Sequence, residues 1–315
     1  MIEASLACNG FVWCTYRDWS FRILDGLLDL PRWRCSLIVT TLDCRFDLAR
    51  FEERGIPVIR IDPRHDLKEG GHGHKTIADL KPKAVFHYGW SWLVPQPVLD
   101  LCPNVTLHPG KLPKDRGGSP IQNQIRNGET WTYANIIKLV PGLDEGPVYL
   151  RERLSLEGDD ADTVWWRMTA AGAMLTRQFL AGIALGTLQP APQDETVEPK
   201  VYKRVRPDAA FLSPETQTAR AMYDIVRAHN ETDANTYVVK AWIDIGQYRL
   251  VIDRAGICAP LLAFSGRSWN LRAEAWCEDR LFDVAFRVNN GKDSAFIAGC
   301  DGIPLFLTRF YVVCR

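Results

Sequence analysis

Three polar residues near the middle of the chain have side chains that suit acid–base chemistry. Asn104 and His108 begin and end the run Asn-Val-Thr-Leu-His, and Asp144 lies in a turn bracketed by Gly142 and Gly146. An imidazole exchanges a proton near neutral pH, an amide donates to a developing negative charge, and a carboxylate orients the imidazole. Because strand side chains alternate, residues four apart share a face. The pattern predicts a proton-transfer site at the end of this strand.

An irregular loop follows His108. Its glycines and prolines are Pro109, Gly110, Pro113, Gly117, Gly118 and Pro120. This density excludes a regular helix or strand and predicts an ordered loop. Loops held by a rigid sheet often carry functional groups, so the loop belongs to the predicted site.

Taken together, these motifs resemble the formyltransferase family that uses N10-formyltetrahydrofolate. The similarity is carried by Asn-x-x-x-His-Pro from Asn104, Leu-Pro-x-x-Arg-Gly-x-x-Pro from Leu112 and Leu-Asp-x-Gly-Pro from Leu143. Three motifs in the family's order are more specific than any one of them. The resemblance extends over roughly the first two-thirds of the chain. It implies a Rossmann-like catalytic domain, N10-formyltetrahydrofolate as co-substrate and no metal.

The resemblance also implies a role for each polar residue. Formyl transfer to an amine needs a base for the amine proton and a donor for the oxygen of the tetrahedral intermediate. His108 is then the general base, Asn104 the oxyanion donor, and Asp144 the orienter of His108 or the proton acceptor. Taken singly, an Asn before a strand and an Asp between glycines are usually turn residues.

A folate slot is implied along residues 86–94, where a flat pterin would lie between apolar walls and meet backbone groups. The predicted folate contacts are Tyr88, Gly89, Trp90, Leu93, Arg116, Gly117 and Asp144. Trp90 and Trp92 equally suit an ordinary core. Arg116 and Gly117 equally suit a tight turn with a solvated arginine.

The predicted acceptor is the primary amine of an amino sugar carried on a nucleotide. Lys203, Arg204 and Arg206 lie in a segment that resembles the Lys-Arg-x-x-Pro-Asp segment of formyltransferases acting on such sugars. These cations can hold a pyrophosphate, although a charged junction fits equally. Tyr-Arg-Asp-Trp, residues 16–19, also resembles the sugar branch. The predicted acceptor contacts are Lys111, Ser119, Gln122, Lys203, Arg204 and Arg206.

Two departures from the family pattern concern the acceptor rather than the reaction. Gly110-Lys111 replaces the usual Ser-Leu after His-Pro, and residues 130–133 replace the usual Thr-Gly.

Three alternatives remain: formylation of methionyl-tRNA, hydrolysis of formyl-folate, and a non-catalytic sugar-nucleotide or folate binder. The tRNA alternative needs a broad basic surface, whereas Lys+Arg and Asp+Glu both number 38.

Composition indicates an ordinary cytoplasmic protein. The nine cysteines include no Cys-x-x-Cys pair, which favours reduced thiols and no zinc site. The first residues lack the pattern of a signal peptide, and no apolar run approaches the ~20 residues of a membrane span. We expect partners to be the folate and the nucleotide-linked amino sugar, with no nucleic acid and no membrane. A homodimer is one role left open for the C-terminal region.

Strand-like and helical segments alternate through the first part of the chain. Strands are predicted over 5–14, 36–40, 57–61, 83–88, 104–108 and 133–140, and helices over 18–30, 46–54, 75–80, 119–127 and 160–185. This alternation predicts an α/β domain with a mostly parallel sheet, residues 1–200. Residues 189–200 are rich in proline and acid and indicate a linker or surface arm. Residues 201–315 are predicted to form a smaller domain, one helix plus a β-rich sheet or barrel-like region.

Overall fold

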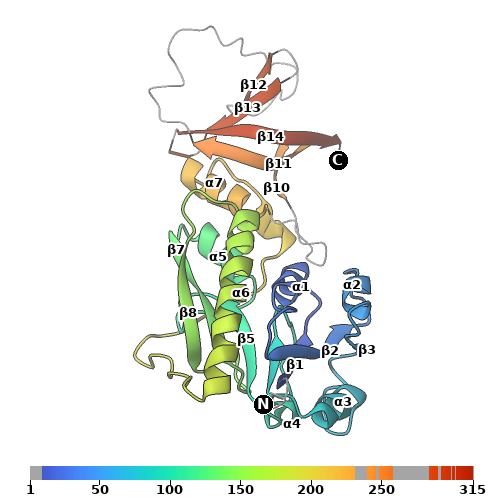
Figure 1. Cartoon of the computed structure of the whole chain (residues 1–315). Helices are drawn as coiled ribbons and strands as arrows, with labels where there is room; N and C mark the ends of the chain where they lie inside the picture. Colours follow the sequence, from blue (N-terminus) through green and yellow to red (C-terminus); the bar gives the residue numbers. More distant parts are fainter. Residues whose placement is uncertain are drawn as a thin grey trace.

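A computed structural model describes residues 9–230, 240–245, 248–257, 284–289, 292–298, 300–301 and 303–314. Its larger sheet has seven strands in the order β3-β2-β1-β4-β5-β7-β8 (Figure 1). These strands are β1 (Asn9–Cys14), β2 (Trp33–Thr41), β3 (Val58–Ile61), β4 (Ala84–His87), β5 (Asn104–Pro109), β7 (Trp131–Lys138) and β8 (Val148–Ser155). The first five are parallel, whereas β7 and β8 are antiparallel. The prediction of a mostly parallel sheet is therefore confirmed.

Helices pack on both faces of this sheet. They are α1 (Asp18–Asp25), α2 (Ala49–Glu52), α3 (His72–Leu80), α4 (Gln96–Leu99), α5 (Pro120–Arg126) and α6 (Ala161–Leu185). On one face, α1 and α6 bury the aromatic side chains of alternate strand residues such as Phe11 and Phe86. On the other, Ile77 of α3 and Val98 of α4 pack against Val85. The two apolar faces explain why the inner strands read as continuous apolar runs.

The long helix α6 begins as predicted. The side chain of Asp160 accepts a hydrogen bond from the Thr163 amide at 2.9 Å, which caps the helix. Gly186 ends it in the left-handed conformation. Strand β8 was missed by sequence reasoning, because Leu-Arg-Glu-Arg-Leu places three charged residues in succession and so lacks the alternation of a half-buried strand. The charges suit its place at the edge of the sheet.

The C-terminal region is rich in β-structure, as predicted. Its sheet is antiparallel, in the order β10-β11-β14-β13-β12. The strands are β10 (Ala241–Ile245), β11 (Tyr248–Ile257), β12 (Val284–Asn289), β13 (Lys292–Ala298) and β14 (Pro304–Cys314). Helix α7 (Ala219–Ala228) packs against this sheet and against α5, so it lies between the two parts of the molecule (Figure 1). Residues 5–8 of the first predicted strand and residues 258–283 of the predicted β-rich region lie outside the described residues.

The predicted arm returns to the loop after His108, where it forms a separate two-stranded sheet. Strand β9 (Lys200–Tyr202) pairs in parallel with β6 (Asp115–Gly117), which lies in the loop after His108. A Cβ on Gly117 would lie 2.4 Å from the Tyr202 carbonyl oxygen. The glycine is therefore needed for the arm to approach the loop.

A short 3-10 helix, η1 (Pro207–Ala210), follows β9 along the chain. No helix in the described part of the chain is long and apolar enough to span a membrane.

Candidate active site

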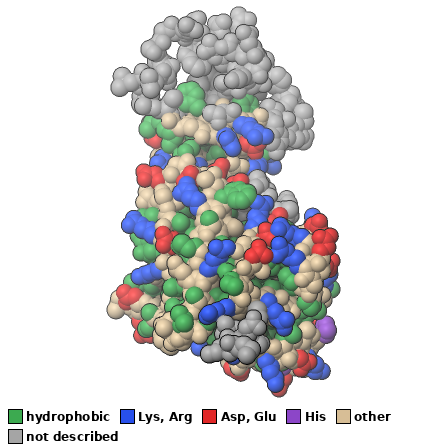
Figure 2. Space-filling view, viewed as in Figure 1, with side chains coloured by type: hydrophobic (Ala, Val, Ile, Leu, Met, Phe, Trp, Pro, Cys, Tyr) green, Lys and Arg blue, Asp and Glu red, His purple; other side chains and the backbone are tan. Residues whose placement is uncertain are grey.

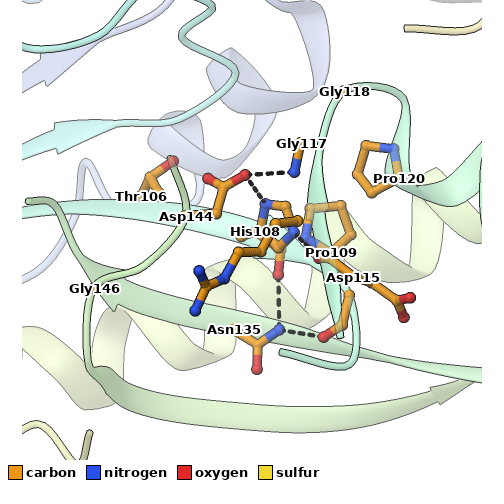
Figure 3. A network of polar contacts seen from close by, with 12 residues as sticks. Thr106, His108, Pro109, Asp115, Gly117, Gly118, Pro120, Asn135, Asp144 and Gly146 are labelled. Carbon is orange, nitrogen blue, oxygen red and sulfur yellow. Dashed lines mark hydrogen bonds and ion pairs between the residues drawn. The ribbon is translucent and has the colours of Figure 1, made fainter. Parts of the chain in front are cut away.

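His108 lies at the end of β5 with a buried side chain (Figure 3). Its Nε2 is 2.7 Å from the backbone carbonyl oxygen of Asp115. A carbonyl only accepts, so this contact assigns the ring hydrogen of neutral His108 to Nε2. Nδ1 therefore carries the lone pair and is the ring nitrogen that can accept a proton.

Asp144 faces that nitrogen. It lies in the turn between β7 and β8 with a left-handed backbone, φ 53°. Its Oδ2 is 3.4 Å from His108 Nδ1 and accepts a hydrogen bond of 2.9 Å from the Gly117 amide (Figure 3). Residues 36 positions apart are thus brought together, and a proton on Nδ1 would have a carboxylate acceptor.

Gln193 holds the Asp144 turn in place. Its Nε2 donates to the carbonyl oxygens of Asp144, at 2.7 Å, and Gly146, at 2.8 Å. Its Oε1 accepts from the Arg116 guanidinium at 2.9 Å. Arg116 also lies 3.4 Å from the Glu145 carboxylate. Sequence reasoning missed Gln193, because an isolated amide in a proline-rich arm has no periodicity or spacing that would mark it.

The Asp115 carbonyl accepts the hydrogen bond from His108, and the Asp115 side chain is itself held by hydrogen bonds. The buried Asp115 carboxylate accepts from the Lys111 amide at 3.1 Å and the Tyr202 hydroxyl at 3.2 Å. Burial and the nearby Asp115 carboxylate raise the pKa of Tyr202 to about 12, so its hydroxyl stays protonated and donates. A Cβ on Gly110 would lie 2.6 Å from the Asp115 carbonyl oxygen and 3.0 Å from His108 Nε2. The unusual Gly110 therefore leaves room for this bond.

Asn104 does not join His108 and Asp144. Its amide hydrogens go to the carbonyl oxygens of Val98, at 2.9 Å, and Cys102, at 2.8 Å. Its Oδ1 faces His87 Nε2 at 2.8 Å. Asn104 and His108 are also four steps apart along the strand, which corresponds to about 13 Å. The structure therefore argues against the predicted oxyanion role: the shared face was right, but the spacing is too long.

Thr106 occupies the intervening position on the same face of β5 (Figure 3). Its hydroxyl donates to the His87 carbonyl oxygen at 2.8 Å. His87 itself is buried, and burial lowers the pKa of its imidazole to about 4. Sequence reasoning passed over Thr106, although alternation along the strand would have placed it nearer to His108 than Asn104.

The predicted folate contacts divide into core and surface residues. Tyr88 is fully buried and its hydroxyl is 2.9 Å from that of Thr176, so its side chain is part of the core. Gly89 has φ 68° and lies close to Arg17. Trp90 is half-buried, and Leu93 is 67% exposed. Gly117 and Asp144 meet beside His108, and Arg116 contacts Gln193 and Glu145 next to the Asp144 turn.

The predicted acceptor contacts lie around the loop, but several are already engaged. Lys111 forms an ion pair with Glu129. The Ser119 hydroxyl accepts from the Val205 amide at 3.2 Å, which places the basic segment Lys203–Arg206 beside the loop. Lys203, Arg204 and Arg206 are exposed there, and Gln122 is half-buried on α5.

Comparison with known proteins shows similarity over part of the chain. Residues 35–176 match the family model described as formyl transferase. The methionyl-tRNA formyltransferase of Kosmotoga olearia is 31% identical over 209 residues, which cover 65% of this chain and 63% of that protein. The chain thus spans less than two thirds of the length of this curated relative.

Solved structures share the fold at lower identity. Methionyl-tRNA formyltransferase from Clostridium thermocellum is 18% identical with a TM-score of 0.60, covering 98% of this chain and 100% of that one. A sugar N-formyltransferase from a Shewanella species is 15% identical with a TM-score of 0.58, covering 75% and 92%. HypX from Aquifex aeolicus in complex with tetrahydrofolic acid is 15% identical with a TM-score of 0.60, covering 95% and 43%. The solved structures therefore share the fold, and residues 35–176, which match the formyl transferase model, include His108 and Asp144.

Proposed function

We propose that the protein transfers a formyl group from N10-formyltetrahydrofolate to the primary amine of an amino sugar carried on a nucleotide. The observation that carries this proposal is the placement of His108 Nδ1 3.4 Å from Asp144 Oδ2 within a formyl transferase domain. The imidazole of His108 can accept a proton. In the resulting imidazolium, each ring N–H has a hydrogen-bond acceptor, the Asp115 carbonyl for Nε2 and the Asp144 carboxylate for Nδ1.

The geometry suggests how the amine proton leaves. As the amine nitrogen bonds to the formyl carbon, it becomes more acidic, and His108 Nδ1 takes its proton. The resulting imidazolium donates from Nε2 to the Asp115 carbonyl and from Nδ1 to the Asp144 carboxylate. Both acceptors are fixed before reaction, so little reorganisation accompanies the charge. The carbon–nitrogen bond to the folate then breaks, and the His108 imidazolium gives its proton to the leaving folate nitrogen, which restores neutral His108.

The formyl oxygen needs a donor other than Asn104. The Thr106 hydroxyl rotates freely about its C–O bond and can turn from the His87 carbonyl toward an oxyanion. We propose Thr106 in this role.

The chemistry of residues 86–94 fits a polar heterocycle. Trp90 Nε1 and His87 Nδ1 are buried and lack a hydrogen-bond partner within the described residues. One is a donor and the other an acceptor, and their rings lie 6.2 Å apart. We propose that the pterin of the folate binds here, with Gly89, Leu93 and Arg116 as further contacts. The tetrahydrofolic acid bound to the HypX structure of similar fold supports a folate as donor.

Methionyl-tRNA is the second candidate acceptor, because relatives of that name match over much of the chain. Basic and acidic side chains are interspersed on the face shown in Figure 2, and the chain has no net charge. A tRNA-binding protein generally needs a large basic surface. We therefore place the nucleotide-linked amino sugar first.

A direct assay distinguishes these acceptors. Purified protein is incubated with N10-formyltetrahydrofolate and either a panel of nucleotide-linked amino sugars or methionyl-tRNA, and formylation is followed by mass. We expect a sugar to gain one formyl group, and His108→Asn to lower its rate by about 10³-fold. Formylation of methionyl-tRNA alone would replace the sugar proposal, and full activity of folded His108→Asn would contradict the proposed base. Formate release without an amine measures hydrolysis.

A further inference from the structure

Two exposed arginines on the edge strand β8 lack carboxylate partners among the described residues. The Arg151 guanidinium lies over the Tyr133 ring, 4.8 Å from its centroid. The Arg153 guanidinium lies over the Trp131 ring at 4.5 Å. Both arginines are exposed, so their charge faces solvent. We name Trp131, Tyr133, Arg151 and Arg153 the arginine ladder.

The arginine ladder lies on the same face of the sheet as His108. Helix α6 covers the opposite face, where Ala134 and Ile136 are buried. Strand β7 pairs Asn135 with His108, so Asn135 and His108 share a face. Tyr133 and Trp131 follow on that face, two and four residues from Asn135, which corresponds to about 7 and 13 Å. The ladder therefore begins beside the proposed site and extends beyond the end of β5.

The rings fix the arginines without neutralising them. A guanidinium stacked on an aromatic ring keeps its charge and its outward N–H donors. Lys111 also lies over the Trp131 ring, at 5.0 Å, but Glu129 neutralises it. The uncompensated charges are thus those of Arg151 and Arg153, two residues apart on one strand. Planar donors held in this way suit phosphate oxygens, which they can bind bidentately.

We propose that Arg151 and Arg153 bind the phosphate groups of a nucleotide-linked amine while its amino group reaches His108. This inference rests on the proposed formyl transfer and names a phosphate site for its acceptor. The site differs from the basic segment Lys203–Arg206, which borders Gly118 and Ser119. Charge complementarity selects the occupant, because the ladder offers two cations and the nucleotide supplies the anions.

The test compares two acceptors with one set of variants. The double variant Arg151→Gln/Arg153→Gln is assayed with a nucleotide-linked amino sugar and with the same amino sugar lacking the nucleotide. We expect KM for the nucleotide-linked sugar to rise about 100-fold with little change in kcat, since each charge-assisted contact contributes about tenfold. Activity on the free sugar and KM for the folate should not change. The control is Arg34→Gln, an exposed arginine near the start of β2.

Other outcomes decide against the inference or separate it from the proposed function. An equal loss on both sugars, or no loss on either, overturns it. If the double variant raises KM for methionyl-tRNA alone, the two arginines bind RNA phosphates, and the proposed nucleotide-linked acceptor is overturned. If the wild-type protein formylates no acceptor, the binding of UDP is measured by calorimetry. Loss of UDP binding in the double variant then supports the phosphate site although the reaction fails, and unchanged binding overturns the site.

Discussion

The side-chain amide of Gln193 donates to the carbonyl oxygen of Asp144 at 2.7 Å, across 49 positions of the chain. Gln193 contacts the turn and Arg116 but not His108, so it acts on the site through the position of Asp144. We expect Gln193→Ala to lower kcat about 10- to 100-fold, because Asp144 would no longer be held opposite His108. Steady-state kinetics measures the effect.

The control for this prediction is Gln96→Ala, since Gln96 bonds only the exposed Asp100 at 2.6 Å among the described residues. A positioning role also predicts a shift in the pH profile of kcat for Gln193→Ala, which a general loss of stability would not produce. Unchanged kcat and pH profile in the folded variant would contradict the role.

Gly110 makes room for the bond between His108 and Asp115. In Gly110→Ala the new methyl group would meet the Asp115 carbonyl oxygen at 2.6 Å, so the carbonyl or the imidazole must move. We expect kcat to fall by at least about 100-fold, because a displaced base costs that much in rate. Gly256→Ala is the matched control, since its methyl group meets nothing within 4 Å. Equal activity of the two variants would show that the bond is dispensable.

Asn104 and Thr106 should separate stability from catalysis. Asn104→Ala leaves the carbonyls of Val98 and Cys102 without their donor, and we expect about 2 kcal/mol of destabilisation with kcat within a few-fold of wild type. Thr106→Val removes a hydroxyl of similar volume, and we expect kcat to fall about 100-fold. Urea unfolding and kinetics measure the two effects. The opposite pattern, with kcat lost in folded Asn104→Ala and kept in Thr106→Val, would restore Asn104 as the oxyanion donor.

His87 should make folding sensitive to mild acid. Its pKa is lowered to about 4 in the folded protein, against about 6.5 in the unfolded chain. Between these values the unfolded chain binds a proton that the folded protein excludes, so stability falls as pH drops from about 6.5 to about 4. The loss is of order 3 kcal/mol. Denaturant unfolding across this range should show a flatter profile for His87→Gln than for the control His72→Gln, which replaces an exposed histidine.

Parts of the site were predictable because they follow from local rules. The alternation of strands and helices gave the sheet, and strand ends with glycine-rich turns located His108 and Asp144. Local rules also gave a wrong assignment. Asn104 and His108 do share a face of the strand, but Thr106 is nearer to His108 and is the better candidate for the oxyanion donor. Gln193 could not be found locally, since its function depends on a contact across 49 positions.

The pairing of β9 with β6 bears on how this molecule can be divided. Tyr202 reaches back to the Asp115 carboxylate at 3.2 Å, and Lys200 donates its amide to the Lys114 carbonyl at 2.8 Å. A cut at residue 200, where the sequence predicts a domain boundary, would run through β9. The Asp115 carbonyl, which accepts the hydrogen bond from His108, would then lose the support of this strand. A shortened protein that keeps the first domain intact must therefore extend at least to Tyr202.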